Sequence, residues 1–197
     1  IQRSASLFLV KNIFSFLLSL FSVVFMMSYP LKPSQISLIS MFTIGIPGFF
    51  LAFQPNKDVI KGHFLTNVLK ALPAGLTDVL AVAAMAVFGQ TFGLGETDIS
   101  TAGTMLLAIV GFMILFKICE PFNWLRGCVW VGSVIGLLGC SIFLPKLFAI
   151  TGMSTKCIML FVVFSIATEP LFRYLTKLVS GVRKLHMKIH KKPVEEF

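Results

Sequence analysis

Charged side chains are scarce in this sequence. Lys, Arg, Asp and Glu make up 13% of the 197 residues, whereas soluble globular domains carry about 25%. Hydrophobic residues make up 56% of the chain, and its mean hydropathy is +0.91. So little charge cannot cover the surface of a water-exposed domain of this length. The composition therefore excludes a soluble globular protein and predicts a membrane protein.

Acidic residues and cysteines are also few. Eight acids stand against 17 Lys and Arg. In a membrane protein an excess of basic residues indicates how the chain is oriented in the membrane and where it contacts anionic lipid. We therefore expect the lipid bilayer, and no nucleic acid, as a partner. The cysteines have no CxxC or metal-ligand spacing, and we expect neither disulfides nor a metal site among them. They are Cys119, Cys128, Cys140 and Cys157.

The apolar residues fall into six runs separated by Pro, Gly and charge clusters. Each run is long enough to cross about 30 Å of hydrocarbon. We therefore expect an all-α fold, a polytopic membrane bundle of six transmembrane helices that occupies residues 1–178. The runs cover residues 7–29, 34–54, 65–88, 101–117, 125–144 and 157–175.

Basic residues mark one side of the predicted membrane. They lie in segments 55–64 and 118–126 and in the tail at 179–197, whose apolar residues share one helical face. By the positive-inside rule both termini are cytoplasmic, and we expect a multi-pass protein of the plasma membrane. The tail is expected to leave the membrane and lie along its anionic leaflet. Near that boundary, the four-residue spacing of Glu169 and Arg173 predicts a local ion pair.

Polar residues recur along the first predicted span. Asn12, Ser15, Ser19 and Ser22 have spacings of three, four and three, which places them on one side of a helix. Serines alone are explained as small residues at helix contacts. The amide of Asn12 must be satisfied, and its oxygen is a possible ligand for a hard cation.

The second predicted span contains a proline near its centre. Pro47 has no N–H to bond the carbonyl of Thr43, and Gly45 and Gly48 ease unwinding. We expect a helix break at Gly45 and Pro47, with Ser40 and Thr43 supplying hydroxyls one turn away. Broken helices recur at ion sites in membranes, and an ordinary proline kink is the alternative.

Asp78 is the only acid near the centre of any predicted span. One reading makes it an ion ligand or a proton carrier. The other, of equal weight, makes it the partner of Lys11, because one uncompensated charge costs about 2.5–3.5 kcal/mol on insertion scales.

In their order, these features resemble the membrane half of cation-transporting P-type (E1-E2) ATPases, from the fifth membrane helix to the tenth. The sequence motifs are most similar to those of a bacterial, calcium-pump-like branch. The resemblance is specific over about residues 1–80 and topological beyond. It rests on Asn12-Ile13-Phe14-Ser15, Pro33-Ser34-Gln35-Ile36, Phe42-Thr43-Ile44-Gly45-Ile46-Pro47 and Gln54-Pro55-Asn56.

The resemblance implies an ion site on the first two spans. Asn12 matches a ligand amide and Thr43 a ligand threonine, so these two are the implied metal ligands. Ser15 stands where calcium pumps place an acid, Ser40 where they place an amide, and Ile44 replaces an aspartate. Asp78 is an additional candidate that the family pattern does not include.

The resemblance also implies parts outside this sequence. ATP and Mg2+ would act in N-terminal cytoplasmic domains of the same polypeptide, and the transported inorganic cation, a divalent ion such as calcium, would bind here. We expect no catalytic residue in this chain, which alone would not hydrolyse ATP. Two alternatives stay open: a self-contained six-span secondary transporter or channel with Asp78 as coupling acid, and a non-catalytic module for a separate ATPase subunit.

Overall fold

The computed structural model describes the backbone of residues 2–52, 64–120 and 123–189. All the regular secondary-structure elements in these ranges are helices, which confirms the predicted all-α fold. One π-helical segment, η1, lies between two α-helices, and α2, η1 and α3 follow one another without a gap. The elements are α1 (Gln2–Val24), α2 (Pro33–Ser40), η1 (Met41–Gly45), α3 (Ile46–Ala52), α4 (Phe64–Thr91), α5 (Glu96–Cys119), α6 (Trp124–Phe143) and α7 (Thr155–Ile189).

Five helical stretches in the described residues are long and apolar enough to cross a membrane. The apolar part of α1, Phe8–Val24, is shorter but reaches the lower end of the usual range of about 17–25 residues. The five are Pro33–Ala52, Ala71–Thr91, Glu96–Cys119, Trp124–Phe143 and Thr155–Val182. Together with α1 they correspond to the six predicted runs.

The first helix ends earlier than the apolar run at 7–29 suggests. Met26 adopts a positive φ of 52°, and the N–H of Met27 donates to the carbonyl of Ser22 at 3.0 Å. The N–H of Met26 donates to the carbonyl of Val23 at 3.2 Å. This pair of bonds is a Schellman cap, which closes the helix although the following residues are apolar.

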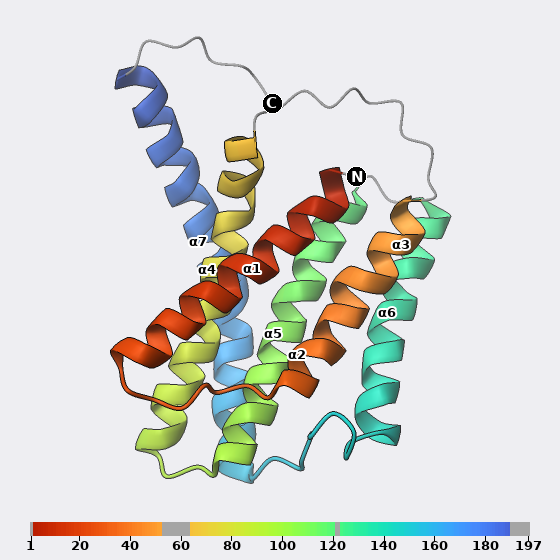
Figure 1. Cartoon of the computed structure of the whole chain (residues 1–197), viewed down its shortest axis with the longest axis vertical. Coiled ribbons are helices and arrows are strands. Elements are labelled where there is room, and N and C mark those ends of the chain that lie inside the picture. Colours follow the sequence, from red (N-terminus) through yellow and green to blue (C-terminus); the bar gives the residue numbers. More distant parts are fainter. Residues whose placement is uncertain (1, 53–63, 121–122, 190–197) are drawn as a thin grey trace.

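Successive spans run in opposite directions (Figure 1). The start of α1 and the end of α7 lie at one end of the bundle, and the loops at 25–32, 92–95 and 144–154 lie at the other. Helix α4 packs against α1, α5 and α7, while α6 contacts α3, η1 and α5. The segment α2–η1–α3 therefore lies beside both α1 and α6.

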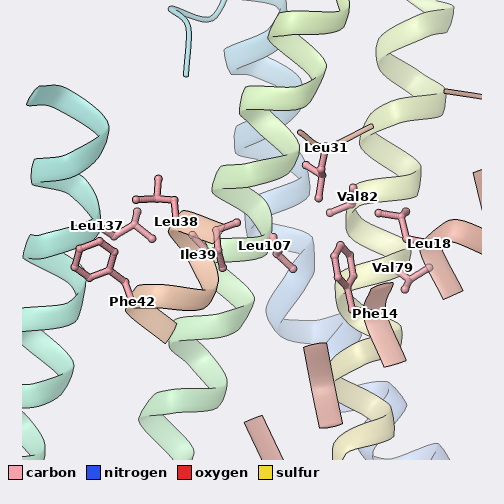
Figure 2. Packing of buried hydrophobic residues seen from close by; sticks show 11 residues of the cluster. Phe14, Leu18, Leu31, Leu38, Ile39, Phe42, Val79, Val82, Leu107 and Leu137 are labelled. Carbon is pink, nitrogen blue, oxygen red and sulfur yellow. The ribbon is translucent and has the colours of Figure 1, made fainter. Parts of the chain in front are cut away.

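The core between these helices is built from interlocking apolar side chains (Figure 2). Phe14 of α1 lies against Val79 and Val82 of α4, and Phe42 of η1 lies against Leu137 of α6. Because lipid tails are themselves apolar, close packing rather than escape from water holds membrane helices together.

Glycines allow a close approach at several contacts between these helices. A Cβ atom built on Gly136 would lie 2.4 Å from Cε1 of Phe42, and one on Gly75 would lie 2.7 Å from Cγ2 of Ile13. Gly136 thus lets α6 approach η1, and Gly75 lets α4 approach α1.

Helix α7 passes without interruption through the predicted domain boundary at 178 and ends at Ile189. Residues 190–197 of the predicted tail lie outside the described residues. Within α7, Arg173 and Glu169 form the predicted ion pair, which is confirmed.

Candidate cation site

A cavity of about 40 Å3 lies between α1, α2–η1, α4 and α5. One water molecule needs about 10–15 Å3 of such volume, so the cavity has room for a small ion with a few waters. Apolar side chains form most of its wall. The lining residues are Val10, Lys11, Phe14, Ile36, Ile39, Ser40, Thr43, Ile44, Asp78, Leu107, Gly111 and Ile114.

The polar lining side chains come from α1, from the continuous segment α2–η1 and from α4. Thr43 of η1 and Asp78 of α4 are 4% and 3% exposed, and Ser40 of α2 and Lys11 of α1 are half-buried. The structure therefore brings together three of the predicted site residues: Asp78 of α4 lines the same cavity as Ser40 and Thr43, which lie far before it in the sequence.

Thr43 sits in the π-helical turn just before the proline. The N–H of Ile46 donates to the carbonyl of Met41, the five-residue spacing of a π-helix, and Pro47 follows directly. The region predicted as a helix break at Gly45 and Pro47 is thus a widened turn inside a continuous helical segment. Such turns are frequent at functional sites. The Thr43 hydroxyl donates to the carbonyl of Ile39 at 2.8 Å, which leaves its oxygen lone pairs as acceptors.

Asp78 is buried with an unsatisfied oxygen. Its Oδ1 atom is fully inaccessible and has no hydrogen-bond partner. The neighbouring Thr77 hydroxyl donates to the carbonyl of Pro73 at 2.7 Å. Lys11 lines the same cavity, yet Lys11 and Asp78, both among the described residues, do not form an ion pair within 4 Å. Buried polar atoms without partners are rare in folded proteins and call for a ligand, water or ion.

The polar stripe of α1 does not reach this cavity. Asn12 is exposed and Ser15 is half-buried, and neither side chain lines the wall. Ser19 is also exposed, whereas Ser22 is buried and its hydroxyl has no hydrogen-bond partner. The α1 residues that line the cavity are instead Val10, Lys11 and Phe14.

Gly111 of α5 is a wall residue that the sequence did not single out. A Cβ atom at this position would lie 2.9 Å from Cγ2 of Thr43 and 3.6 Å from its Oγ1. No local pattern reveals such a contact, because the two residues meet only when α5 packs against η1.

Gln35 is a second buried polar residue whose role appears only in the fold. Its Oε1 accepts from the backbone N–H of Lys32 at 2.9 Å and from the hydroxyl of Ser100 at 2.6 Å. Its Nε2 donates to the carbonyl of Ala149 at 3.0 Å. Gln35 thereby joins the start of α2 to α5 and to the loop before α7, away from the cavity.

Sequence comparisons place the chain among cation-transporting ATPases. It is 34% identical over 164 residues to a protein of Streptococcus pneumoniae named "Probable cation-transporting ATPase exp7", covering 79% of this chain and 21% of that protein. It is 30% identical to the "Calcium-transporting ATPase CtpE" of Mycolicibacterium smegmatis over 141 residues and to that of Mycobacterium tuberculosis over 143, each match covering 64% of this chain and 18% of the relative. No protein-family model and no solved structure matches the chain.

The fold and the cavity define a multi-pass helical membrane bundle with a polar site among its spans. By its sequence the chain belongs to the cation-transporting P-type ATPases, which confirms the predicted resemblance. It spans about a fifth of the length of the curated relatives that it matches.

Proposed function

We propose that this chain is the membrane part of an ATP-driven cation pump and that the cavity between α1, η1, α4 and α5 is its cation site. The observation that carries the proposal is the buried Oδ1 of Asp78, which has no hydrogen-bond partner and belongs to a residue that lines the same cavity as Ser40 and Thr43. The relatives' names as cation-transporting and calcium-transporting ATPases support a divalent cation such as calcium.

The oxygen atoms around the cavity suit a hard cation. Asp78 offers a carboxylate, and Ser40 and Thr43 offer hydroxyl oxygens. Calcium takes about six to eight oxygen ligands, so these groups supply part of a shell that waters complete. Asn12 follows Lys11 by one residue, about 100° around the helix. We propose that Asn12 and Ser15 join the ligands when α1 turns this edge toward the cavity.

Asp78 has two candidate partners in the cavity, the transported cation and the ammonium group of Lys11. Both side chains line the cavity, and a lysine ammonium there would compete with a bound cation for the carboxylate. In the proposed site Asp78 binds the transported ion, and the positive charge of Lys11 weakens that binding.

The proposed transport cycle couples this site to ATP. Phosphorylation, with ATP and Mg2+, takes place in cytoplasmic domains of the same polypeptide and tilts the helices, which opens the site to one face at a time. Ion binding and phosphorylation then favour each other reciprocally. The common end of α1 and α7 would face the cytoplasm of a plasma membrane, in keeping with the basic residues at 55–64 and 118–126.

The test is cation-stimulated phosphorylation of the native protein, purified from membranes into lipid nanodiscs. We expect stimulation by Ca2+ or another divalent ion, and its loss in Thr43→Ala. Thr91→Ala is the matched control, because Thr91 is exposed and makes the same bond to the carbonyl four residues earlier, at 2.8 Å. Equal stimulation in Thr43→Ala and Thr91→Ala would contradict the site.

A self-contained secondary transporter or channel is the second candidate. The unpartnered carboxylate of Asp78 in a cavity also suits a coupling acid that carries a proton. This function would be favoured by a native protein with a mass near 21.7 kDa that moves cations in proteoliposomes without ATP.

A further inference from the structure

The cavity wall on α5 includes a glycine, Gly111, whose lack of a side chain leaves room for Thr43. Gly111 of α5 faces Thr43 of η1, and a Cβ atom built on it would lie 2.9 Å from Cγ2 and 3.3 Å from Cβ of Thr43. Real Cβ atoms essentially never approach another carbon to within 3.0 Å. Any other residue at 111 therefore requires Thr43 or the helices to move.

Thr43 has little freedom to yield. Its branched side chain has few favourable χ1 positions, and it is 4% exposed. Its hydroxyl is also held by the bond to the carbonyl of Ile39 at 2.8 Å. A rotation that removed the clash would break this bond and turn the hydroxyl away from its present direction.

Other close glycines in the bundle serve packing alone. Gly75 meets Ile13, and Gly136 meets the ring of Phe42, both of them apolar partners, and neither glycine lines the cavity. Gly111 differs because it lines the cavity and its neighbour carries a possible ligand oxygen.

We propose that Gly111 is a positioning residue of the cation site: the absence of its side chain fixes the direction of the Thr43 hydroxyl and sets the size of ion that fits. The inference rests on the proposed cation site. It adds a determinant of affinity and selectivity on a helix that supplies no ligand of its own to the cavity.

The clash predicts a specific rescue. Replacing Thr43 with Ser removes Cγ2, the atom nearest to the new Cβ, and retains the hydroxyl. Gly111→Ala should therefore impair the site when Thr43 is present and do little harm when Ser stands in its place. A loss that came only from general damage to helix packing would not respond to the Thr43→Ser change.

The experiment is equilibrium binding of radioactive Ca2+, and of Mn2+ as a smaller probe, to the native protein in nanodiscs. Gly111→Ala should weaken Ca2+ binding about 10–100-fold, the range seen when groups that orient metal ligands are removed. Mn2+ binding should weaken less. The double variant Gly111→Ala/Thr43→Ser should return to within about threefold of Thr43→Ser alone, a difference below about 0.7 kcal/mol.

Gly132→Ala is the matched control, because a Cβ atom there meets nothing within 4 Å. Unchanged Ca2+ binding in Gly111→Ala would overturn the inference, as would a double variant that binds as weakly as Gly111→Ala. If Gly111→Ala does not fold, the double variant decides, since it must fold and bind.

The two proposals fail differently. A native protein that binds neither ion, or an Asp78→Asn variant that binds both normally, removes the cation site itself and the inference with it. Normal binding by Gly111→Ala combined with lost binding in Asp78→Asn removes only the role of Gly111.

Discussion

Two buried polar side chains, Gln35 and Asp78, occupy different regions of the bundle and have opposite hydrogen-bond status. Gln35 is 0% exposed, and both its Oε1 and its Nε2 have partners. Asp78 is 3% exposed, and its Oδ1 has none. Burial of a polar group is therefore common to a structural tie and to a candidate binding site, and the difference lies in whether its atoms are satisfied.

The two regions also differ in what surrounds them. Gln35 fills its position and is bonded to α5 and to the loop before α7. Asp78 borders a cavity whose other polar groups come from α1, α2 and η1. A satisfied network makes a fold rigid, whereas an open cavity beside an unsatisfied carboxylate is able to accept a ligand.

The largest expected effect is that of Asp78→Asn. Removing the carboxylate should abolish the rise in thermal unfolding temperature that Ca2+ causes in the native protein, because only an ion bound to the folded state stabilises it. Without Ca2+ the variant should be at least as stable as the native protein, since an amide costs no more to bury without a partner than a carboxyl group does. Differential scanning fluorimetry in nanodiscs measures both. If Ca2+ raised the unfolding temperature of Asp78→Asn as much as that of the native protein, Asp78 would have a structural role like that of Gln35.

Gln35→Ala should have the opposite effects: lower stability of the fold and unchanged Ca2+ binding. It leaves the Ser100 hydroxyl and the Ala149 carbonyl without their partner, which we expect to cost about 1–3 kcal/mol of unfolding free energy. The Ca2+ affinity of the folded protein should stay within about twofold. Gln90→Ala is the control, since Gln90 is exposed on α4. A Gln35→Ala variant of normal stability with lost Ca2+ binding would reverse the assignment of the two regions.

The smallest expected effect is that of Lys11→Met. With the ammonium gone from the cavity wall, Ca2+ should bind roughly fivefold more tightly, corresponding to about 1 kcal/mol of relieved repulsion. Lys146→Met, at an exposed position in a loop, is the control. If Asp78 instead served mainly as the partner of Lys11, the variant would lose stability and gain no affinity. Ca2+ titration and thermal unfolding of the same samples separate the two roles.

Much of the fold was predictable because it depends on local composition. Apolar runs located the spans, and a lone acid and a central proline drew attention to Asp78 and to the segment with Thr43. The end of α1 was not predictable from hydropathy, since the cap at Met26 and Met27 lies within apolar sequence.

The arrangement of the candidate site was only partly predictable. Ser40, Thr43 and Asp78 do line one cavity, but the spacing of the α1 stripe could not fix how that helix is rotated, and Asn12 is exposed. Gly111 and Gln35 act through contacts between helices distant in sequence, with Gln35 and Ser100 65 positions apart. Such contacts leave no periodic signal in a single chain.

The most direct measurement is to locate the bound ion. The native protein would be crystallised with Mn2+ or Ca2+ and the ion identified by anomalous scattering. We predict an ion in the cavity, with the Asp78 carboxylate among its ligands at about 2.0–2.6 Å, a range that covers small and large divalent ions. An ion coordinated elsewhere among the membrane helices, with Asp78 bonded to Lys11 instead, would contradict the proposed site.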